Sequence, residues 1–163
     1  MLCLTEDPAS ASMWHHYAGG LSGVVIELEC IERFDSPWFA ARPVTYGTRA
    51  AEMFNADELA NIFLMPGDKA RAAILDLGTF RKAPEWSYER EWRVVTSKRP
   101  RDTGHFTDYP FHSEEVSAVY LGPRIDSADR DSLIVAARSL PHARVLQVAI
   151  GMGQSFVFSE VTA

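Results

Sequence analysis

One short segment constrains the fold of this chain more than any other, because it places aromatic and charged side chains close together. It spans residues 82–95 and contains two Trp, one Tyr, three Glu and two Arg. Successive side chains of a strand point to opposite faces, so a strand from Tyr88 onward places Glu89, Glu91 and Arg93 on one face. Charged side chains are costly to bury unless they pair or bind a ligand. This face is therefore either an ion-pair network or a functional site.

The composition is that of a folded domain. The chain has 163 residues, of which 47% are hydrophobic and 23% are charged, and we expect residues 1–163 to form a single domain. The formal net charge of -6 argues against nucleic acid or an anionic membrane as the default partner. Residues 81–101 nevertheless carry an excess of Lys and Arg. That excess suits an anionic ligand or, more simply, a solvated charged face.

Cysteine usage and hydropathy favour a cytoplasmic location. Only Cys3 and Cys30 are present, and their spacing fits neither a zinc site nor a redox motif, so both are expected to be reduced. No basic region followed by a long apolar run begins the chain, and no apolar run approaches the roughly 20 residues that a membrane helix needs. No set of Asp, Glu and His side chains has metal-ligand spacing, so no metal site is predicted.

The periodicity predicts an α+β fold with a mixed or mostly antiparallel central sheet and three to four flanking helices. Strands are expected at residues 2–4, 23–29, 42–46, 116–121, 145–150 and 154–158, besides the one that begins at Tyr88. Helices are expected to begin after Ser10 or Ser12, at Asn55, at Asp68 and at Asp126, with Gly78 ending the third. Glu27, on the second strand, is expected to point outward into solvent.

The pattern of aromatic residues predicts which side chains are buried. Four side chains are predicted to be largely buried, with the central strand in the interior of its sheet: Trp14, Tyr17, Trp92 and Val94. Adjacent helix positions diverge by about 100°, so His15 and His16 cannot easily share one metal ion. We expect hydrogen bonds to hold His16 near the central strand, with His15 pointing towards solvent.

Several blocks of sequence carry a family resemblance. They are Thr5-Glu6-Asp7, Met13-Trp14-His15-His16-Tyr17-Ala18, Gly23-Val24-Val25-Ile26-Glu27, the strand 44–46, Lys82 with Trp86-Ser87-Tyr88-Glu89-Arg90-Glu91-Trp92-Arg93, and Val119-Tyr120-Leu121-Gly122. In this order they resemble the bacterial family called domain of unknown function 2971, over residues 3–125. Members of that family usually carry a further N-terminal region, so we expect this chain to be truncated relative to them. The family in places resembles phage-resistance proteins, which implies a defence or toxin role by analogy.

A first functional hypothesis is an enzyme of the ADP-ribosyltransferase type. The Glu-x-Glu pair is similar to the biglutamate motif of arginine-modifying transferases, and this similarity implies that Glu91 is the catalytic carboxylate and Glu89 its helper. NAD would be the cofactor. The remaining candidate binding residues are His16 and Tyr17 for gripping NAD, Trp86 and Tyr88 for stacking on nicotinamide, and Arg93 for holding a carboxylate or an anion.

A second hypothesis belongs to a different class. The chain would be a non-catalytic nucleotide- or RNA-binding sensor module of a defence system, whose basic segment meets an anionic partner. The net charge does not favour nucleic acid, and a metal-dependent nuclease is a distant third alternative.

Overall fold

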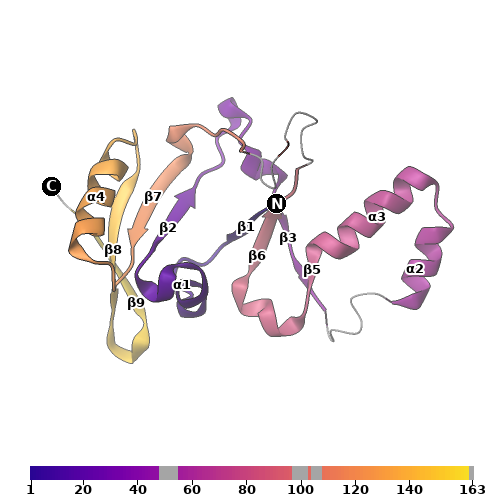
Figure 1. Ribbon diagram of the computed structural model, residues 1–163, viewed down its shortest axis with the longest axis horizontal. Helices are drawn as coiled ribbons and strands as arrows, with labels where there is room; N and C mark the ends of the chain where they lie inside the picture. The colour runs from indigo at the N-terminus through magenta and orange to yellow at the C-terminus, as the bar shows by residue number, and fades with distance from the viewer. Residues whose placement is uncertain (48–54, 97–102, 104–107, 162–163) are drawn as a thin grey trace. The chain divides into compact units, whose positions relative to one another are not determined.

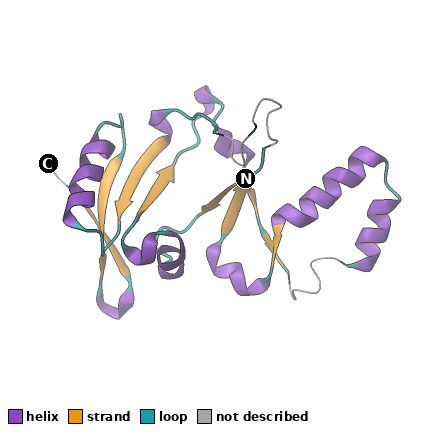
Figure 2. Ribbon diagram, in the orientation of Figure 1, coloured by secondary structure: helices purple, strands orange, loops and turns teal. Residues whose placement is uncertain are grey.

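The computed structural model describes residues 1–47, 55–96, 103 and 108–161. They form an α+β fold in which most strand pairs are antiparallel, as predicted (Figures 1 and 2). The strands belong to three sheets instead of one central sheet. The chain divides into two compact units, unit 1 with Met1–Asp7 and Ala41–Val95, and unit 2 with Pro8–Ala40 and Thr96–Ala163. The expectation of a single domain over residues 1–163 stays a prediction.

Unit 1 is built around a three-stranded antiparallel sheet. Strand β6 (Glu91–Val94) lies between β1 (Leu2–Thr5) and β3 (Arg42–Pro43), so the central strand is an interior one, as predicted. The short edge strand β3 contains Pro43, a residue that removes a ladder donor and is tolerated at an edge. Strands β4 (Thr45–Tyr46) and β5 (Arg81–Lys82) form a separate parallel pair.

Two helices complete unit 1 and pack against each other as a hairpin. They are α2 (Ala56–Phe63) and α3 (Gly67–Phe80). Asn55 caps α2, because its Oδ1 accepts a hydrogen bond of 2.8 Å from the N–H of Asp57. The prediction that Gly78 ends α3 is wrong. The helix continues to Phe80, whose buried side chain extends the packed face beyond the glycine.

The segment before β6 is not the strand that the alternation predicted. Residues Pro84–Glu89 form a 3-10 helix, η5, and Pro84 occupies its first turn, where the missing N–H costs nothing. Arg90 then adopts a left-handed conformation with φ of 44°, which turns the chain into β6. Tyr88 and Glu89 therefore lie on the helical turn, and the strand begins only at Glu91.

Unit 2 contains a four-stranded sheet in the order β2 (Val24–Leu28), β7 (Val116–Leu121), β8 (Arg144–Ile150) and β9 (Phe156–Glu160). Strands β7 and β8 are parallel, and helix α4 (Ser127–Arg138) provides the crossover between them. Asp126 caps α4, as predicted, by accepting a hydrogen bond of 2.9 Å from the N–H of Asp129. Strands β8 and β9 form the expected hairpin.

Helices cover both faces of this sheet. Alternate residues of β7 point to opposite faces, so Val119 and Leu121 pack with α4 while Ala118 and Tyr120 pack with α1 (Ala11–Tyr17). Ser10 is the cap of α1. No helix in the described part of the chain is both long enough and apolar enough to cross a membrane.

The burial predictions are partly confirmed. Trp14 and Val94 are buried and Trp92 is half-buried. The prediction for Tyr17 is wrong, since its side chain is 64% exposed. Trp14 and Ala18, four residues apart, face the core, and Tyr17 lies outside that face.

A close approach of backbones joins two loops of unit 2. Gly122, directly after β7, donates a hydrogen bond of 3.0 Å to the carbonyl oxygen of Gly23, and the N–H of Arg124 donates one of 3.0 Å to that of Leu21. Leu21 itself has a φ of 79°. A Cβ atom on Gly122 would lie 2.3 Å from the Leu21 oxygen and 2.7 Å from the Gly23 oxygen. Only glycine fits this position.

We predict that Gly122→Ala lowers the free energy of unfolding by about 1–3 kcal/mol, because the methyl group must displace backbone atoms. Gly78→Ala is the matched control, since a Cβ atom there meets nothing within 4 Å and alanine favours the helix by about 1 kcal/mol. Urea denaturation of both variants measures the difference. Equal stability of Gly122→Ala and the wild type would refute the packing argument.

Candidate functional site

The interior strand of unit 1 carries a buried pair of opposite charges. Glu91 and Arg93 lie two positions apart on β6, and their side chains share one face, as the strand period predicts. Arg93 Nε lies 2.7 Å from Glu91 Oε1 and Arg93 Nη2 lies 2.9 Å from Glu91 Oε2. Both side chains are buried. This two-pronged geometry is the one that best offsets the cost of removing a carboxylate from water.

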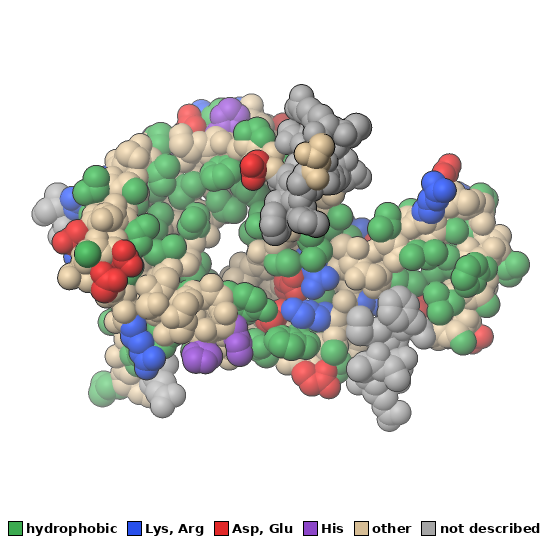
Figure 3. All heavy atoms as spheres, viewed as in Figure 1, with side chains coloured by type: hydrophobic (Ala, Val, Ile, Leu, Met, Phe, Trp, Pro, Cys, Tyr) green, Lys and Arg blue, Asp and Glu red, His purple; other side chains and the backbone are tan. Residues whose placement is uncertain are grey.

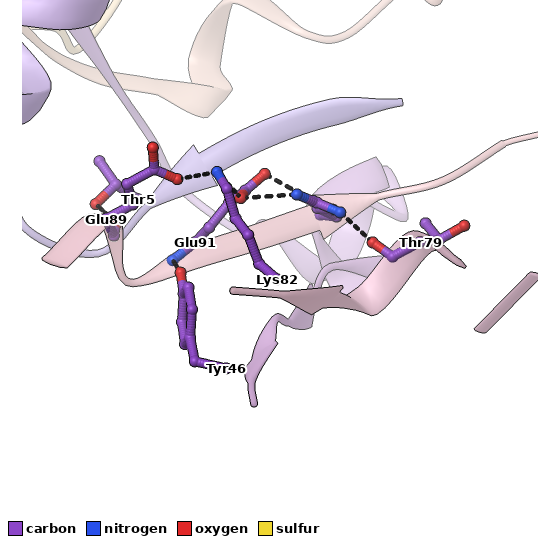
Figure 4. A network of polar contacts seen from close by, with 7 residues as sticks. Thr5, Tyr46, Thr79, Lys82, Glu89 and Glu91 are labelled. Carbon is purple, nitrogen blue, oxygen red and sulfur yellow. Dashed lines mark hydrogen bonds and ion pairs between the residues drawn. The ribbon is translucent and has the colours of Figure 1, made fainter. Parts of the chain in front are cut away.

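Lys82 links this pair to the second carboxylate. Its Nζ donates hydrogen bonds to Glu89 Oε2 and to Glu91 Oε2, the latter over 3.0 Å (Figure 4). Glu89 is only 1% exposed. Glu89 and Glu91 therefore belong to one polar cluster, although Glu89 lies on η5 and not on the strand. We call Lys82, Glu89, Glu91 and Arg93 the buried ionic cluster; with two positive and two negative side chains, its formal charge is zero.

Residues from other strands hold the backbone of the two glutamates in place. Thr5 Oγ1 donates to the Glu89 carbonyl oxygen over 2.7 Å, and the N–H of Glu91 donates to the Tyr46 hydroxyl over 2.8 Å (Figure 4). On the opposite side of the cluster, Arg93 donates to the carbonyl oxygen of Thr79. The left-handed turn between Glu89 and Glu91 is thus fixed from both flanks.

The electrostatics keep Glu91 ionised. Burial raises the pKa of Glu91, but hydrogen bonds from Arg93, Cys3 and Lys82, together with the charge of Arg93, outweigh it and lower the pKa to about 2. For Lys82, burial lowers the pKa, but hydrogen bonds to both carboxylates more than offset this effect and raise it. Both groups are therefore charged at neutral pH.

An aromatic pair lies beside the ionic cluster on η5. The ring centroids of Trp86 and Tyr88 are 6.1 Å apart, and Lys82 Nζ lies 5.0 Å from the centroid of Trp86. Trp86 is 41% exposed and Tyr88 is 37% exposed. These two predicted stacking residues share unit 1 with Glu89, Glu91 and Arg93.

The other two predicted binding residues belong to unit 2. His16 and Tyr17 lie at the end of α1, and both are exposed. His15 is exposed too, as predicted, but His16 is not held by hydrogen bonds as expected: within the described residues, its ring contacts are with His15 and Tyr17. Their role in binding stays a prediction.

Sequence reasoning missed two features. One is the role of Lys82, for which its position shortly before the Trp86–Arg93 block is the available signal. Glu27 is not simply solvated, because its carboxylate accepts hydrogen bonds from Tyr120 and, over 2.8 Å, from Ser117. Burial and the bond to Glu27 raise the pKa of Tyr120 to about 12. Among the described residues, no group of three His, Cys, Asp or Glu side chains could hold a metal ion.

We predict an acid-sensitive contribution of Glu91 to stability. Its folded pKa of about 2 lies below the ordinary 4.5, so the contribution is complete above pH 4.5 and is lost as the pH falls towards 2. The shift corresponds to at most about 3 kcal/mol. Urea denaturation of the wild type and Glu91→Gln from pH 7 to acid should give two curves that converge as the pH falls. Curves that stay parallel would show that the ion pairs of Glu91 make no pH-dependent contribution to stability.

The comparisons with known proteins identify a family. No curated protein and no solved structure matches the chain. The family model described as "Protein of unknown function (DUF2971)" matches residues 13–94, which is half of the chain. The match begins within α1 of unit 2 and includes, in unit 1, the ionic cluster and the aromatic pair. The chain therefore belongs to the DUF2971 family of proteins of unknown function.

Proposed function

We propose that unit 1 binds an anionic ligand with a planar ring system, of the nucleotide class, and that NAD is the first such ligand to test. The observation that carries the proposal is the aromatic pair, because Trp86 and Tyr88 remain well exposed and the ammonium group of Lys82 lies 5.0 Å from the centroid of the Trp86 ring. Exposed aromatic side chains stack on bases of any sequence, and a neighbouring cation favours an anionic substituent. The site thus offers a stacking surface beside an ammonium group whose charge Glu89 and Glu91 balance.

The buried ionic cluster supports this proposal by fixing Lys82. Two carboxylates hold the ammonium group, whose side chain is still 22% exposed. An already ordered lysine loses little conformational freedom on binding, so more of the interaction energy appears as affinity. Glu89 and Glu91 act here as positioning residues, and the module needs no catalytic step.

The ADP-ribosyltransferase hypothesis is a second candidate that one observation favours. An oxocarbenium-like transition state needs an ionised carboxylate beside it, and the pKa of about 2 keeps Glu91 in that form. Both oxygens of Glu91 accept hydrogen bonds, however, and its side chain is only 4% exposed. A ribosyl group therefore reaches Glu91 only after Lys82 and Arg93 release a carboxylate oxygen, and Glu89 would then act as the helper.

We predict that NAD binds and that Trp86→Ala weakens its binding by about 1–3 kcal/mol, the range for a lost stacking contact. Phe111→Ala is the matched control, because Phe111 is 51% exposed but belongs to unit 2. Calorimetric titration of NAD and of ATP into the three proteins measures the difference. The proposal is refuted if neither NAD nor ATP binds. It is also refuted if Trp86→Ala and Phe111→Ala weaken binding equally.

Turnover separates the two candidates. If nicotinamide is released and Glu91→Gln abolishes the release while NAD still binds, the chain is a transferase or glycohydrolase. If NAD or ATP binds without turnover, the chain is a binding module. A role in phage defence, which the family resemblance implies, is tested by comparing phage plating on cells that express the wild type or Trp86→Ala.

A further inference from the structure

The ligand site proposed for unit 1 needs a cation other than Lys82. Two buried carboxylates balance the ammonium group of Lys82, so it offers an anionic ligand little net charge. Figure 3 shows Lys and Arg side chains, in blue, over the region where Figure 1 labels β5 and β6. The basic residues of β5, of β6 and of the turn between η5 and β6 are Arg81, Lys82, Arg90 and Arg93. Their ion pairs decide which of them a ligand can recruit.

Two more of these residues are held by paired short bonds. Arg81 donates two hydrogen bonds of 2.8 Å to Glu58. Arg93 donates to both oxygens of Glu91, as described above. A guanidinium group in such a two-pronged pair is strongly held. Neither arginine is therefore easily released to a ligand.

Arg90, in contrast, is held loosely. Its Nη1 lies 3.9 Å from Glu6 Oε1, which is beyond hydrogen-bond distance, and the side chains of Arg90 and Glu6 are 59% and 53% exposed. Glu6 also accepts a hydrogen bond of 3.3 Å from Trp92 Nε1. Exposed ion pairs add little stability and are screened by salt. An anionic ligand can therefore replace Glu6 as the partner of Arg90.

The backbone gives a second reason to assign a function to the Arg90 side chain. Its φ of 44° and ψ of 50° lie in the left-handed region, which glycine adopts readily and a residue with a Cβ atom does not. Strained positions of this kind cluster at functional sites. Glycine would make the same turn with less strain, so the turn by itself does not account for an arginine here.

The position of Arg90 suits the phosphate end of a nucleotide. Arg90 follows Tyr88 by two residues, so their Cα atoms lie within about 7 Å of each other. The ribose of a nucleotide separates the base from the phosphates, so a phosphate-binding group belongs beside the stacking rings and not beneath them. Arginine matches phosphate through two parallel N–H bonds. Thr5 and Tyr46 fix the backbone on both sides of Arg90, so its side chain starts from a defined point.

We propose that Arg90 binds the phosphate groups of a mononucleotide whose base stacks on Trp86 and Tyr88, and that Glu6 is the partner of Arg90 before the ligand binds. This inference rests on the proposed function of unit 1. It narrows the ligand class, because it requires a phosphate, which a free nucleoside lacks. Binding exchanges the ion pair with Glu6 for one with phosphate.

The test is calorimetric titration of the full chain with ADP, which carries the diphosphate that NAD also contains, and with adenosine, which has none. We expect the wild type to bind ADP at least about tenfold more tightly than adenosine, as a charge-assisted pair predicts. Arg90→Gly should bring this ratio close to one. Glu6→Gln should tighten ADP binding by at most about fivefold and leave adenosine binding unchanged.

Urea denaturation shows whether Arg90 serves the fold instead. Glycine suits the left-handed turn, so Arg90→Gly should resist urea at least as well as the wild type. A less stable Arg90→Gly would give the side chain a structural role and overturn the inference. Arg42→Gln is the matched control, because Arg42 is a comparably exposed arginine of unit 1, 55% exposed and paired with Asp76. It should bind both ligands like the wild type.

Trp86→Ala separates this inference from the proposed function, because it should weaken ADP and adenosine by the same factor. If it does so while Arg90→Gly leaves the ratio of the two affinities unchanged, the stacking site stands and Arg90 is not its phosphate-binding residue. The same holds if Arg42→Gln lowers the ratio equally. If neither ligand binds the wild type, the proposed function and this inference both fail.

Discussion

The two-pronged ion pair between Glu91 and Arg93 is the interaction on which the rest of unit 1 depends. Both side chains are buried on the interior strand β6, and neither could remain there alone, because an unpaired buried charge costs several kcal/mol. Lys82 from β5 and Glu89 from η5 complete a cluster with no net formal charge. The cluster thus connects the strand, the 3-10 turn and the end of the α2–α3 hairpin.

A buried ionic cluster is a weak argument for stability by itself, since apolar residues of similar volume often stabilise a core equally well. Its consequence here is geometric. Thr5 and Tyr46 bond the backbone on either side of Arg90, so the left-handed turn has a single arrangement, and the aromatic pair on η5 follows from it. The proposed ligand site at Trp86 and Tyr88 is therefore the exposed part of a segment that the buried ionic cluster holds in place.

Unit 2 depends on a different constraint, the close approach of backbones at Gly122. Its sheet has an apolar cluster on each face, formed with α4 and with α1, so the ordinary hydrophobic effect accounts for its core. The contact between Gly122 and the carbonyl oxygens of Leu21 and Gly23 fixes the loop after α1. This contact is a structural reason for the Leu121-Gly122 sequence at the end of β7, and no functional reason is needed.

The sequence by itself determined the features that arise from neighbouring residues. The caps at Ser10, Asn55 and Asp126 mark helix starts because a cap acts over three residues. The strand period places Glu91 and Arg93 on one face, and the family resemblance rests on blocks of adjacent residues. All of these signals are local, so they can be recognised without knowledge of the tertiary structure.

Only the tertiary structure decided where β6 begins, which residue joins the two carboxylates, and that Tyr17 is exposed. The bonds that fix the turn at Arg90 come from Thr5 and Tyr46, which lie 84 and 45 residues away from their partners in the sequence. No pattern within residues 82–95 encodes them. Alternation of polar and apolar residues fits a strand and a 3-10 turn equally well over so short a segment, and the choice between the two was made by contacts with distant strands.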